Sequence, residues 1–185
     1  MDNKSNLISG LENNLNLLAW VLAPDTATAK FPKVYLAIFA WVKSFCFLER
    51  QFPQLAIGLP RGFAKTFLIK VIACYLIIFT DKRFILVVNE NSEKAASTIK
   101  DIFNMLQASW ILYLFGDWRP SIVTDKEGKK IFKFKDKIRI LKGVGVFAGV
   151  RGIVEDQRRP DVIFLDDIQS KLDSESESES KKIES

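Results

Sequence analysis

Two short, uninterrupted apolar runs limit the folds open to this chain more than any other feature. Phe84–Val88 (FILVV) and Val162–Leu165 (VIFL) contain no polar side chain, which is typical of strands buried on both faces of a parallel sheet. Helices are expected at Lys65–Phe79 and over about residues 91–108. This order of elements predicts an α/β fold with a mainly parallel central sheet flanked by helices.

The chain is expected to have three parts. They are an N-terminal helical segment over residues 1–50, a core over residues 51–170 and a solvated, acidic Ser/Glu tail over residues 171–185. The other expected elements are an amphipathic helix at Leu7–Leu22, a largely buried helix at Val34–Arg50, a short strand at Leu55–Gly58, and a hairpin or two edge strands at Ile131–Phe134 and Ile138–Leu141.

The chain has no histidine among its 185 residues. This excludes His-based general acid–base catalysis, a Ser-His-Asp triad and any His-ligated zinc or haem. Cys46 and Cys74 lie inside apolar runs, so we expect them to be small buried side chains rather than part of a disulfide framework. The longest apolar stretches, Val34–Leu48 and Val71–Phe79, fall short of the roughly 20 unbroken apolar residues that span a bilayer.

The formal net charge of +5 is unevenly distributed along the chain. Residues 171–185 carry a net charge of −2, so the first 170 residues carry 24 basic and 17 acidic side chains, a net charge of +7. A body of this charge is attracted to polyanions such as nucleic acids or nucleotide phosphates. Simple solubility explains the same charge equally well.

The segment GLPRGFAKT, residues 58–66, follows an expected strand and opens an expected helix. Such a turn can hold phosphate oxygens with its backbone N–H groups. The cofactor-binding residues here would be Pro60, Arg61, Gly62, Phe63, Ala64, Lys65 and Thr66. Lys65 would reach the terminal phosphates, and the Thr66 hydroxyl would bind Mg²⁺. The pattern G-x-x-x-x-G-K-[ST] is not met, because Leu59 and Ala64 stand where it has glycine. The alternative is an ordinary turn with a lysine at the start of a helix.

A pair of carboxylates, Asp166 and Asp167, follows the second apolar run directly. Ligands of open α/β sheets bind at the carboxyl ends of the strands, where these side chains are expected. Asp166 would hold Mg²⁺, and Asp167 would polarise the attacking water. The alternative is a strand that ends in a solvated acidic turn.

Four segments together resemble the ATPase half of the large terminase subunit of tailed bacteriophages, the DNA-packaging motor. They are LPRGFAKT at 59–66, ILVVNENSEKA at 85–95, VRG at 150–152 and RRPDVIFLDDI at 158–168. The resemblance covers about residues 50–170 and depends on the order and spacing of the segments. It implies a P-loop NTPase of the ASCE type with ATP and Mg²⁺ as cofactors.

The resemblance also implies roles for individual residues. The phosphate loop of this family has an arginine four residues before the lysine, and Arg61 stands at that place. Arg61, Lys65 and Asp167 would then be catalytic, with Arg61 near the γ-phosphate, while Thr66 and Asp166 would hold the metal. The family has Asp-Glu or Asp-Asp at this place, so Asp167 is acceptable there, although its side chain is one methylene shorter than that of glutamate. The family often has an adenine-binding glutamine near Gln51 or Gln54, and an Arg-Gly pair like Arg151-Gly152 in a loop beside the sheet.

As partners, the resemblance implies double-stranded DNA, the portal protein and the small terminase subunit. It further implies a homo-oligomeric ring when assembled on the portal, no membrane, and a place in the host cell cytoplasm. The chain stops about 18 residues after Asp167, so the fold is expected to be truncated after this second motif, without the strands and the nuclease domain that follow in the family. Alternatives are another P-loop DNA-dependent ATPase, such as a helicase-like protein, or a catalytically inactive truncated fragment.

Overall fold

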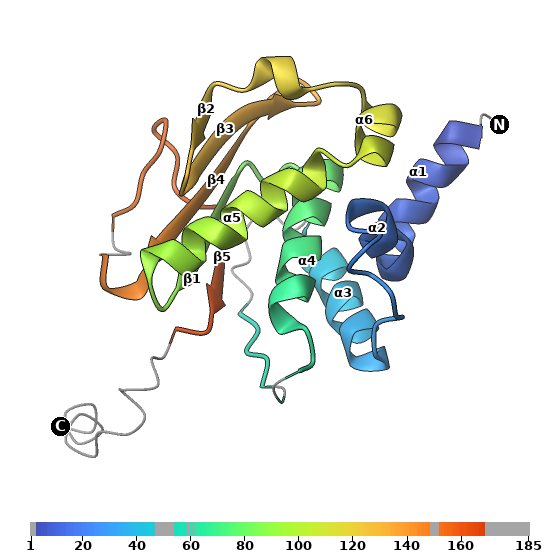
Figure 1. Ribbon diagram of the computed structural model, residues 1–185, viewed down its shortest axis with the longest axis horizontal. Helices are drawn as coiled ribbons and strands as arrows, with labels where there is room; N and C mark the ends of the chain where they lie inside the picture. Colours follow the sequence, from blue (N-terminus) through green and yellow to red (C-terminus); the bar gives the residue numbers. More distant parts are fainter. Residues whose placement is uncertain (1–2, 47–53, 59, 61, 149–151, 169–185) are drawn as a thin grey trace.

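The computed structural model describes residues 3–46, 54–58, 60, 62–148 and 152–168. Four helices precede the first strand, two more helices follow that strand, and the other four strands come last in the described chain (Figure 1). The elements are α1 (Asn3–Asn13), α2 (Leu15–Leu22), α3 (Lys33–Cys46), α4 (Lys65–Phe79), β1 (Phe84–Asn89), α5 (Ser92–Leu106), α6 (Ser109–Phe115), β2 (Thr124–Lys126), β3 (Lys129–Phe134), β4 (Lys137–Gly145) and β5 (Val162–Asp166), with single 3-10 turns at Arg119–Ser121 and Val146–Ala148.

The sheet is mixed, with the strand order β2-β3-β4-β1-β5. Strand β1 runs parallel to β4 and β5, whereas the β2–β3 and β3–β4 pairs are antiparallel. The expectation of a mainly parallel sheet is therefore wrong. Strands β3 and β4 are antiparallel because a tight turn joins them, in which Lys135 and Asp136 have φ angles of 49° and 60°. Such left-handed pairs make the two-residue turns that join antiparallel strands.

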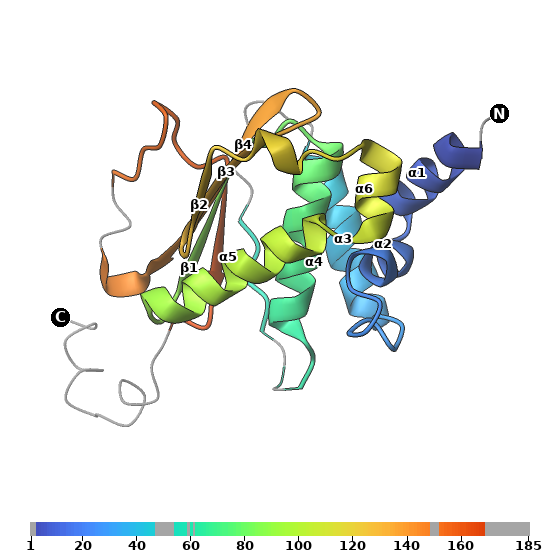
Figure 2. The same ribbon diagram turned by 45° about the horizontal axis from the view of Figure 1, so that its top comes forward.

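The helices lie on one face of the sheet, and Figure 2 shows this arrangement nearly edge-on. Ile85 and Val87 of β1 point into the main core on that face, together with residues of all six helices. Helix α5 crosses β4 so closely that a Cβ on Gly143 would lie 2.7 Å from the Ala95 carbonyl oxygen. On the other face, Phe84, Leu86 and Val88 form a smaller cluster with Ile140, and no α-helical residue joins it within the described chain.

Several expected elements are confirmed because their signals are local. Helix α4 has the expected bounds, and β1 is buried at every residue. Helix α5 begins where the Asn91 side chain accepts a hydrogen bond from the Lys94 amide (2.9 Å), as an N-cap does. The hairpin at β3 and β4 is also confirmed. Helix α6 and strand β2 were not expected from the sequence.

Three expectations in the N-terminal half are wrong. The single helix at Leu7–Leu22 is two helices, because Asn14 leaves helical geometry and its side chain caps α2. Helix α3 is not largely buried: it packs on α4 along one side, and Val34 and Leu36 are exposed. Residues 55–58 form no strand, because no neighbouring strand pairs with them in the described chain. Residues 47–53 and the tail from 169 onwards lie outside the described residues.

Strand β5 differs from β1 although both were expected to be buried on both faces. Its side chains alternate between partly buried and exposed, and Ile163 and Leu165 are 50% and 61% exposed. Strand β5 pairs with β1 alone among the described strands. It is therefore an edge strand, whose outward side chains lack a covering layer. No helix in the described part of the chain is long and apolar enough to cross a membrane.

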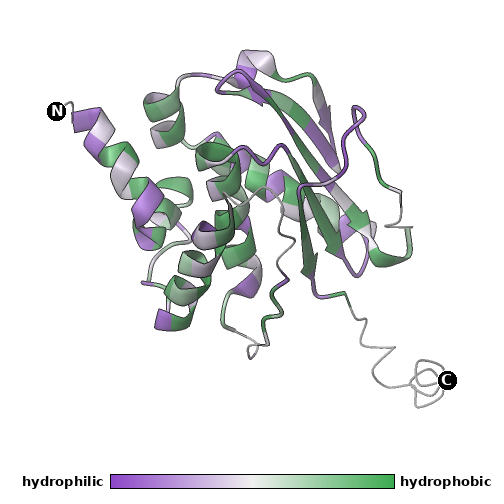
Figure 3. Cartoon of the chain, turned by 180° about the vertical axis from the view of Figure 1, so that it is seen from behind, coloured by the Kyte–Doolittle hydropathy of each residue, from purple (hydrophilic) through white to green (hydrophobic). Residues whose placement is uncertain are grey.

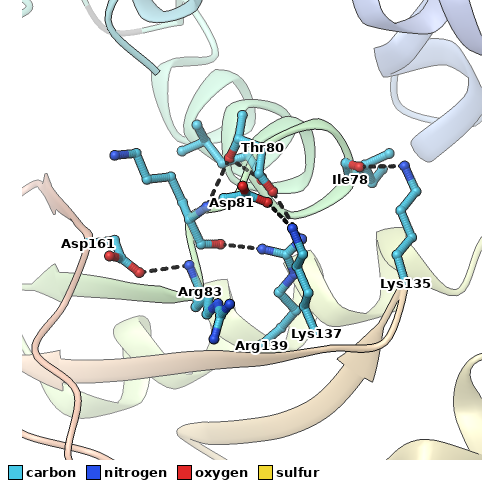
Figure 4. A network of polar contacts seen from close by, with 10 residues as sticks. Ile78, Thr80, Asp81, Arg83, Lys135, Lys137, Arg139 and Asp161 are labelled. Atoms are coloured by element: carbon cyan, nitrogen blue, oxygen red, sulfur yellow. Dashed lines mark hydrogen bonds and ion pairs between the residues drawn. The ribbon is translucent and has the colours of Figure 1, made fainter. Parts of the chain in front are cut away.

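A buried arginine anchors the amino end of the parallel strands (Figure 4). Arg139 of β4 is 2% exposed and donates to the Lys82 and Thr80 carbonyl oxygens at 2.7 and 3.0 Å. The Asp161 carboxylate accepts from the backbone amides of Arg83 and Phe84 at 2.7 and 2.8 Å. These contacts fix where β1 begins relative to β4 and β5, and so determine which residues meet at the carboxyl ends.

The loop that leads into β5 is fastened to the sheet by an ion-pair cluster. The Glu155 carboxylate accepts hydrogen bonds from Lys142 (2.6 Å) and from Lys129, and its side chain is 15% exposed. Asp156 and Gln157 have φ angles of 49° and 59° and make a tight turn closed by a bridge between Glu155 and Arg158. The hydrogen bonds from Lys129 and Lys142 hold the pKa of Glu155 below its ordinary value.

We expect Arg139→Met to lower the free energy of unfolding by about 2–4 kcal/mol, because two carbonyl oxygens, that of Thr80 buried and that of Lys82 partly buried, lose their donors. Urea denaturation followed by circular dichroism measures this. Arg83→Met is the matched control, since the Arg83 side chain does not donate to either carbonyl. Equal losses in both variants would show that Arg139 has no special anchoring role.

We expect Glu155→Gln to cost about 1–3 kcal/mol at neutral pH, because one carboxylate holds two ammonium groups. Since folding lowers the pKa of Glu155 below 4.5, this stabilisation is complete above that pH and is lost as the pH falls through the folded-state pKa. The difference in free energy of unfolding between wild type and variant should therefore become smaller below about pH 4.5. A gap that stays constant down to about pH 3 contradicts this assignment.

Candidate functional site

The start of α4 and the end of β5 meet through one hydrogen bond. The Thr66 hydroxyl donates to Oδ2 of Asp166 at 2.9 Å, joining residues 100 positions apart. Thr66 stands in the first turn of α4, and Asp166 is the last residue of β5 and is buried. A buried carboxylate needs such polar partners. The two residues expected to share a metal ion are thus in direct contact.

The turn before α4 has the geometry of a compact backbone loop. Gly62 has a φ angle of 85° and Ala64 one of 52°, both in the left-handed region. The Lys65 ammonium donates to the Pro60 carbonyl oxygen at 3.5 Å, across the mouth of the turn. The hydroxyl of Tyr35, on α3, donates to the Phe63 carbonyl oxygen and ties the turn to the N-terminal helices.

A hollow of about 710 Å³ opens between this turn and the end of β5. Its volume is within the range of about 300–1,000 Å³ that is usual for small-molecule sites. Its lining comes from the two candidate motifs: Pro60, Gly62, Phe63, Ala64, Lys65, Thr66, Asp166, Asp167 and Ile168. The structure therefore brings together the expected phosphate-loop and metal-binding residues that it describes.

Of the other candidates, three lie outside the described residues and two are placed elsewhere. Arg61, Gln51 and Arg151 lie outside the described residues. Gln54 is described, is exposed and does not line the hollow. Gly152 lines a separate hollow of about 200 Å³, over β1 and β5 on the helix-free face of the sheet.

Asn89 is a polar residue of this edge that the sequence did not single out. It is the last residue of β1, is buried, and lies in register beside Asp166 of β5 and Gly145 of β4. Its Oδ1 accepts from the backbone amide of Glu90 at 2.9 Å. A polar residue directly after the apolar run FILVV was the available signal, because a buried amide at a strand end commonly has a specific partner.

A cation stands near the acidic end of the site. Lys94, in the first turn of α5, forms an ion pair at 2.7 Å with Glu90, which precedes the helix. The pKa of Lys94 is raised chiefly by its hydrogen bond to Glu90, and the charge of Asp167 adds to this. The carboxyl edge of β1 and β5 therefore carries charges of both signs.

The donors at this edge suit Mg²⁺ and phosphate. Mg²⁺ prefers oxygen ligands and usually keeps several waters, so one carboxylate and one hydroxyl from the protein are enough beside substrate phosphates. No cluster of three or more His, Cys, Asp or Glu side chains is present among the described residues. The Thr66–Asp166 pair therefore fits a metal ion that is completed by phosphate oxygens and water.

We expect Ala64→Gly to raise the free energy of unfolding by about 0.5–1 kcal/mol, because a left-handed φ angle strains alanine and not glycine. Thermal unfolding measures this. The control is Ala96→Gly inside α5, which should cost about 1 kcal/mol. A loss of the same size at both positions contradicts the left-handed geometry of Ala64.

The contact between α4 and β5 is the basis for inferring function. No protein-family model, curated protein or solved structure matches the chain. The chemistry of the site is therefore inferred from Thr66, Asp166 and the turn before α4.

Proposed function

We propose that this chain binds ATP with Mg²⁺ and hydrolyses it, as the ATPase part of a DNA-packaging motor similar to the large terminase subunit. The observation that carries the proposal is the 2.9 Å hydrogen bond between Thr66 and Asp166. In a P-loop ATPase, the hydroxyl at the start of the helix and the carboxylate at the strand end hold the same metal ion. The two groups lie together here although they are far apart in the sequence.

Binding would use the turn before α4 and its first residues. The backbone amides near Gly62 and Ala64 and the N-terminus of α4 attract the phosphates, because helix N-termini carry a partial positive charge. Lys65 would exchange its contact with the Pro60 carbonyl oxygen for a phosphate oxygen. Thr66 and Asp166 would hold Mg²⁺, which neutralises charge on the phosphates when bound.

Hydrolysis would use the carboxylate that follows. In the reaction, a water oxygen bonds to the γ-phosphorus. The bond between this phosphorus and the β–γ bridging oxygen breaks at the same time, giving ADP and phosphate. Asp167 lines the hollow beside Asp166 and would accept a hydrogen bond from this water and orient it. Arg61 is proposed to stabilise the negative charge that spreads over the transferred phosphoryl oxygens.

The wider role follows from the same proposal. Hydrolysis would drive double-stranded DNA into a procapsid within the host cell cytoplasm. The chain would act beside the portal protein and the small terminase subunit, in a homo-oligomeric ring assembled on the portal. Its basic body supports contact with DNA.

We expect calorimetric titration with Mg²⁺–ATP to give saturable binding that Lys65→Ala and Asp166→Asn each weaken at least tenfold. The reason is the loss of a phosphate contact in one variant and of a metal ligand in the other. Lys100→Ala, which removes an exposed lysine from α5, is the matched control and should bind as wild type does. Chelating the metal should weaken wild-type binding and affect Asp166→Asn less.

Circular dichroism must show each variant to be folded. A folded wild type that binds no nucleotide would refute the proposal. So would a Lys65→Ala variant with undiminished affinity.

A further inference from the structure

Three lysines form a row across neighbouring strands on the helix-free face of the sheet. Lys126 of β2 lies in register with Lys129 of β3, which in turn lies in register with Lys142 of β4. Residues directly opposite one another share a face of the sheet, with Cβ atoms about 4.5–5.5 Å apart. Lys133, two residues beyond Ile131 on β3, lies on the same face. We call these four residues the lysine face.

Like charges in register are unfavourable, and this chain offsets them only in part. Opposed like charges destabilise a sheet. Within the described residues, the ion pairs of the lysine face are those of Lys129 and Lys142, both with Glu155. One carboxylate therefore stands against four ammonium groups. This excess of positive charge favours binding of an external anion.

The strands that carry the lysine face are basic overall. Residues 124–145 contain eight basic and three acidic side chains, a net charge of +5; four of the basic residues form the lysine face, whereas Lys130 and Arg139 lie on the opposite face of the sheet. The turn that carries Glu155 also carries a further carboxylate, Asp156, and two arginines, Arg158 and Arg159, all three exposed.

No helix covers the lysine face in the described part of the chain. The view from behind in Figure 3 shows the strands in front of α5, with hydrophilic segments along β2 and β3. The loop at 152–160 crosses the β1–β5 part of this face, where Ile153 and Arg159 line the smaller hollow, and reaches the lysine face through Glu155, which pairs with Lys129 and Lys142. Lys126 and Lys133 lie on the same face, toward the edge of the sheet opposite β5, and are exposed.

We propose that the lysine face is a docking surface for the phosphate backbone of duplex DNA. A row of ammonium groups along an open sheet face suits a polymer with regularly spaced phosphates, and such contacts position DNA without reading its sequence. The choice of duplex DNA among polyanions rests on the proposed function. The surface is separate from the nucleotide hollow, since no residue of the lysine face lines that hollow.

The test is fluorescence anisotropy of the full chain with a labelled duplex of about 30 base pairs at several salt concentrations. Lys126→Ala/Lys133→Ala/Arg158→Ala removes three exposed cations from the lysine face and its adjoining turn. We expect at least a tenfold loss of affinity and a salt slope smaller by about 2–3, since each phosphate contact contributes about 1. The matched control is Lys30→Ala/Lys33→Ala/Lys100→Ala, which removes the same charge from exposed sites elsewhere and should change affinity by less than about threefold.

A variant that binds duplex DNA more tightly provides a second test, because loss of folding would not increase the affinity. Glu155→Gln removes the carboxylate that holds Lys129 and Lys142 and should tighten duplex binding severalfold. The control Glu93→Gln, at an exposed site in the first turn of α5, should have less effect. Equal losses in the two triple variants, or no tightening by a folded Glu155→Gln, would overturn the proposal.

Competition identifies the occupant. Unlabelled duplex should displace the labelled duplex. Poly-L-glutamate, added at the same concentration of negative charges, should not displace it. Equal displacement by both would overturn duplex DNA as the ligand. Failure of the proposed function is detected separately, because Lys65→Ala reports on Mg²⁺–ATP binding and leaves the lysine face unchanged.

Discussion

Burial of β1 on both faces and along both edges is the constraint on which the rest of the structure depends. Every residue of this strand is buried, so its backbone amides and carbonyls must be paired inside the protein. Parallel pairing with β4 and β5 meets this need along its length, and the Asp161 carboxylate meets it at the amino end. The register that results places Asn89 beside Asp166. The position of the candidate site therefore follows from how the backbone hydrogen bonds of β1 are paired.

The two faces of the sheet have different physical characters. One face is packed by helices and contributes the main core, which holds α4 at the angle that brings Thr66 to Asp166. The other face combines a small apolar cluster with the lysine face and Glu155, the carboxylate that pairs with two of its lysines. Nucleotide chemistry and nucleic-acid contact would thus occupy separate surfaces. The strands lie between them and connect them through the backbone.

Local signals made much of the fold predictable from the sequence. The bounds of α4 and the start of α5 at Asn91 follow from periodicity and capping, and β1 follows from its unbroken apolar run. Leu55–Gly58 has the composition of a strand, but a strand also requires a neighbour to pair with. The same limit applies to β5, whose apolar side chains do not reveal that one edge lacks a partner in the described chain.

Within the site, the two motifs suggested that the turn at residues 60–66 and the pair at 166–167 would meet, because Thr66 at a helix start and Asp166 at a strand end were both expected to bind Mg²⁺. The contact of Glu155 with Lys129 and Lys142 had no such signal, since it depends on how a loop crosses the sheet. Asn89 was concealed for a related reason. Its place beside Asp166 is set by the register between strands, which no local pattern encodes.

The position of Asp166 on an edge strand has a consequence for dynamics. Strand β5 is hydrogen-bonded to β1 alone among the described strands and exposes Ile163 and Leu165, so its local opening costs less free energy than opening β1. Half of the candidate metal site is therefore built on one of the less stable segments of the sheet. A ligand that bridges Thr66 and Asp166 would slow amide hydrogen exchange along β5 more than along β1, because binding closes the segment that otherwise frays.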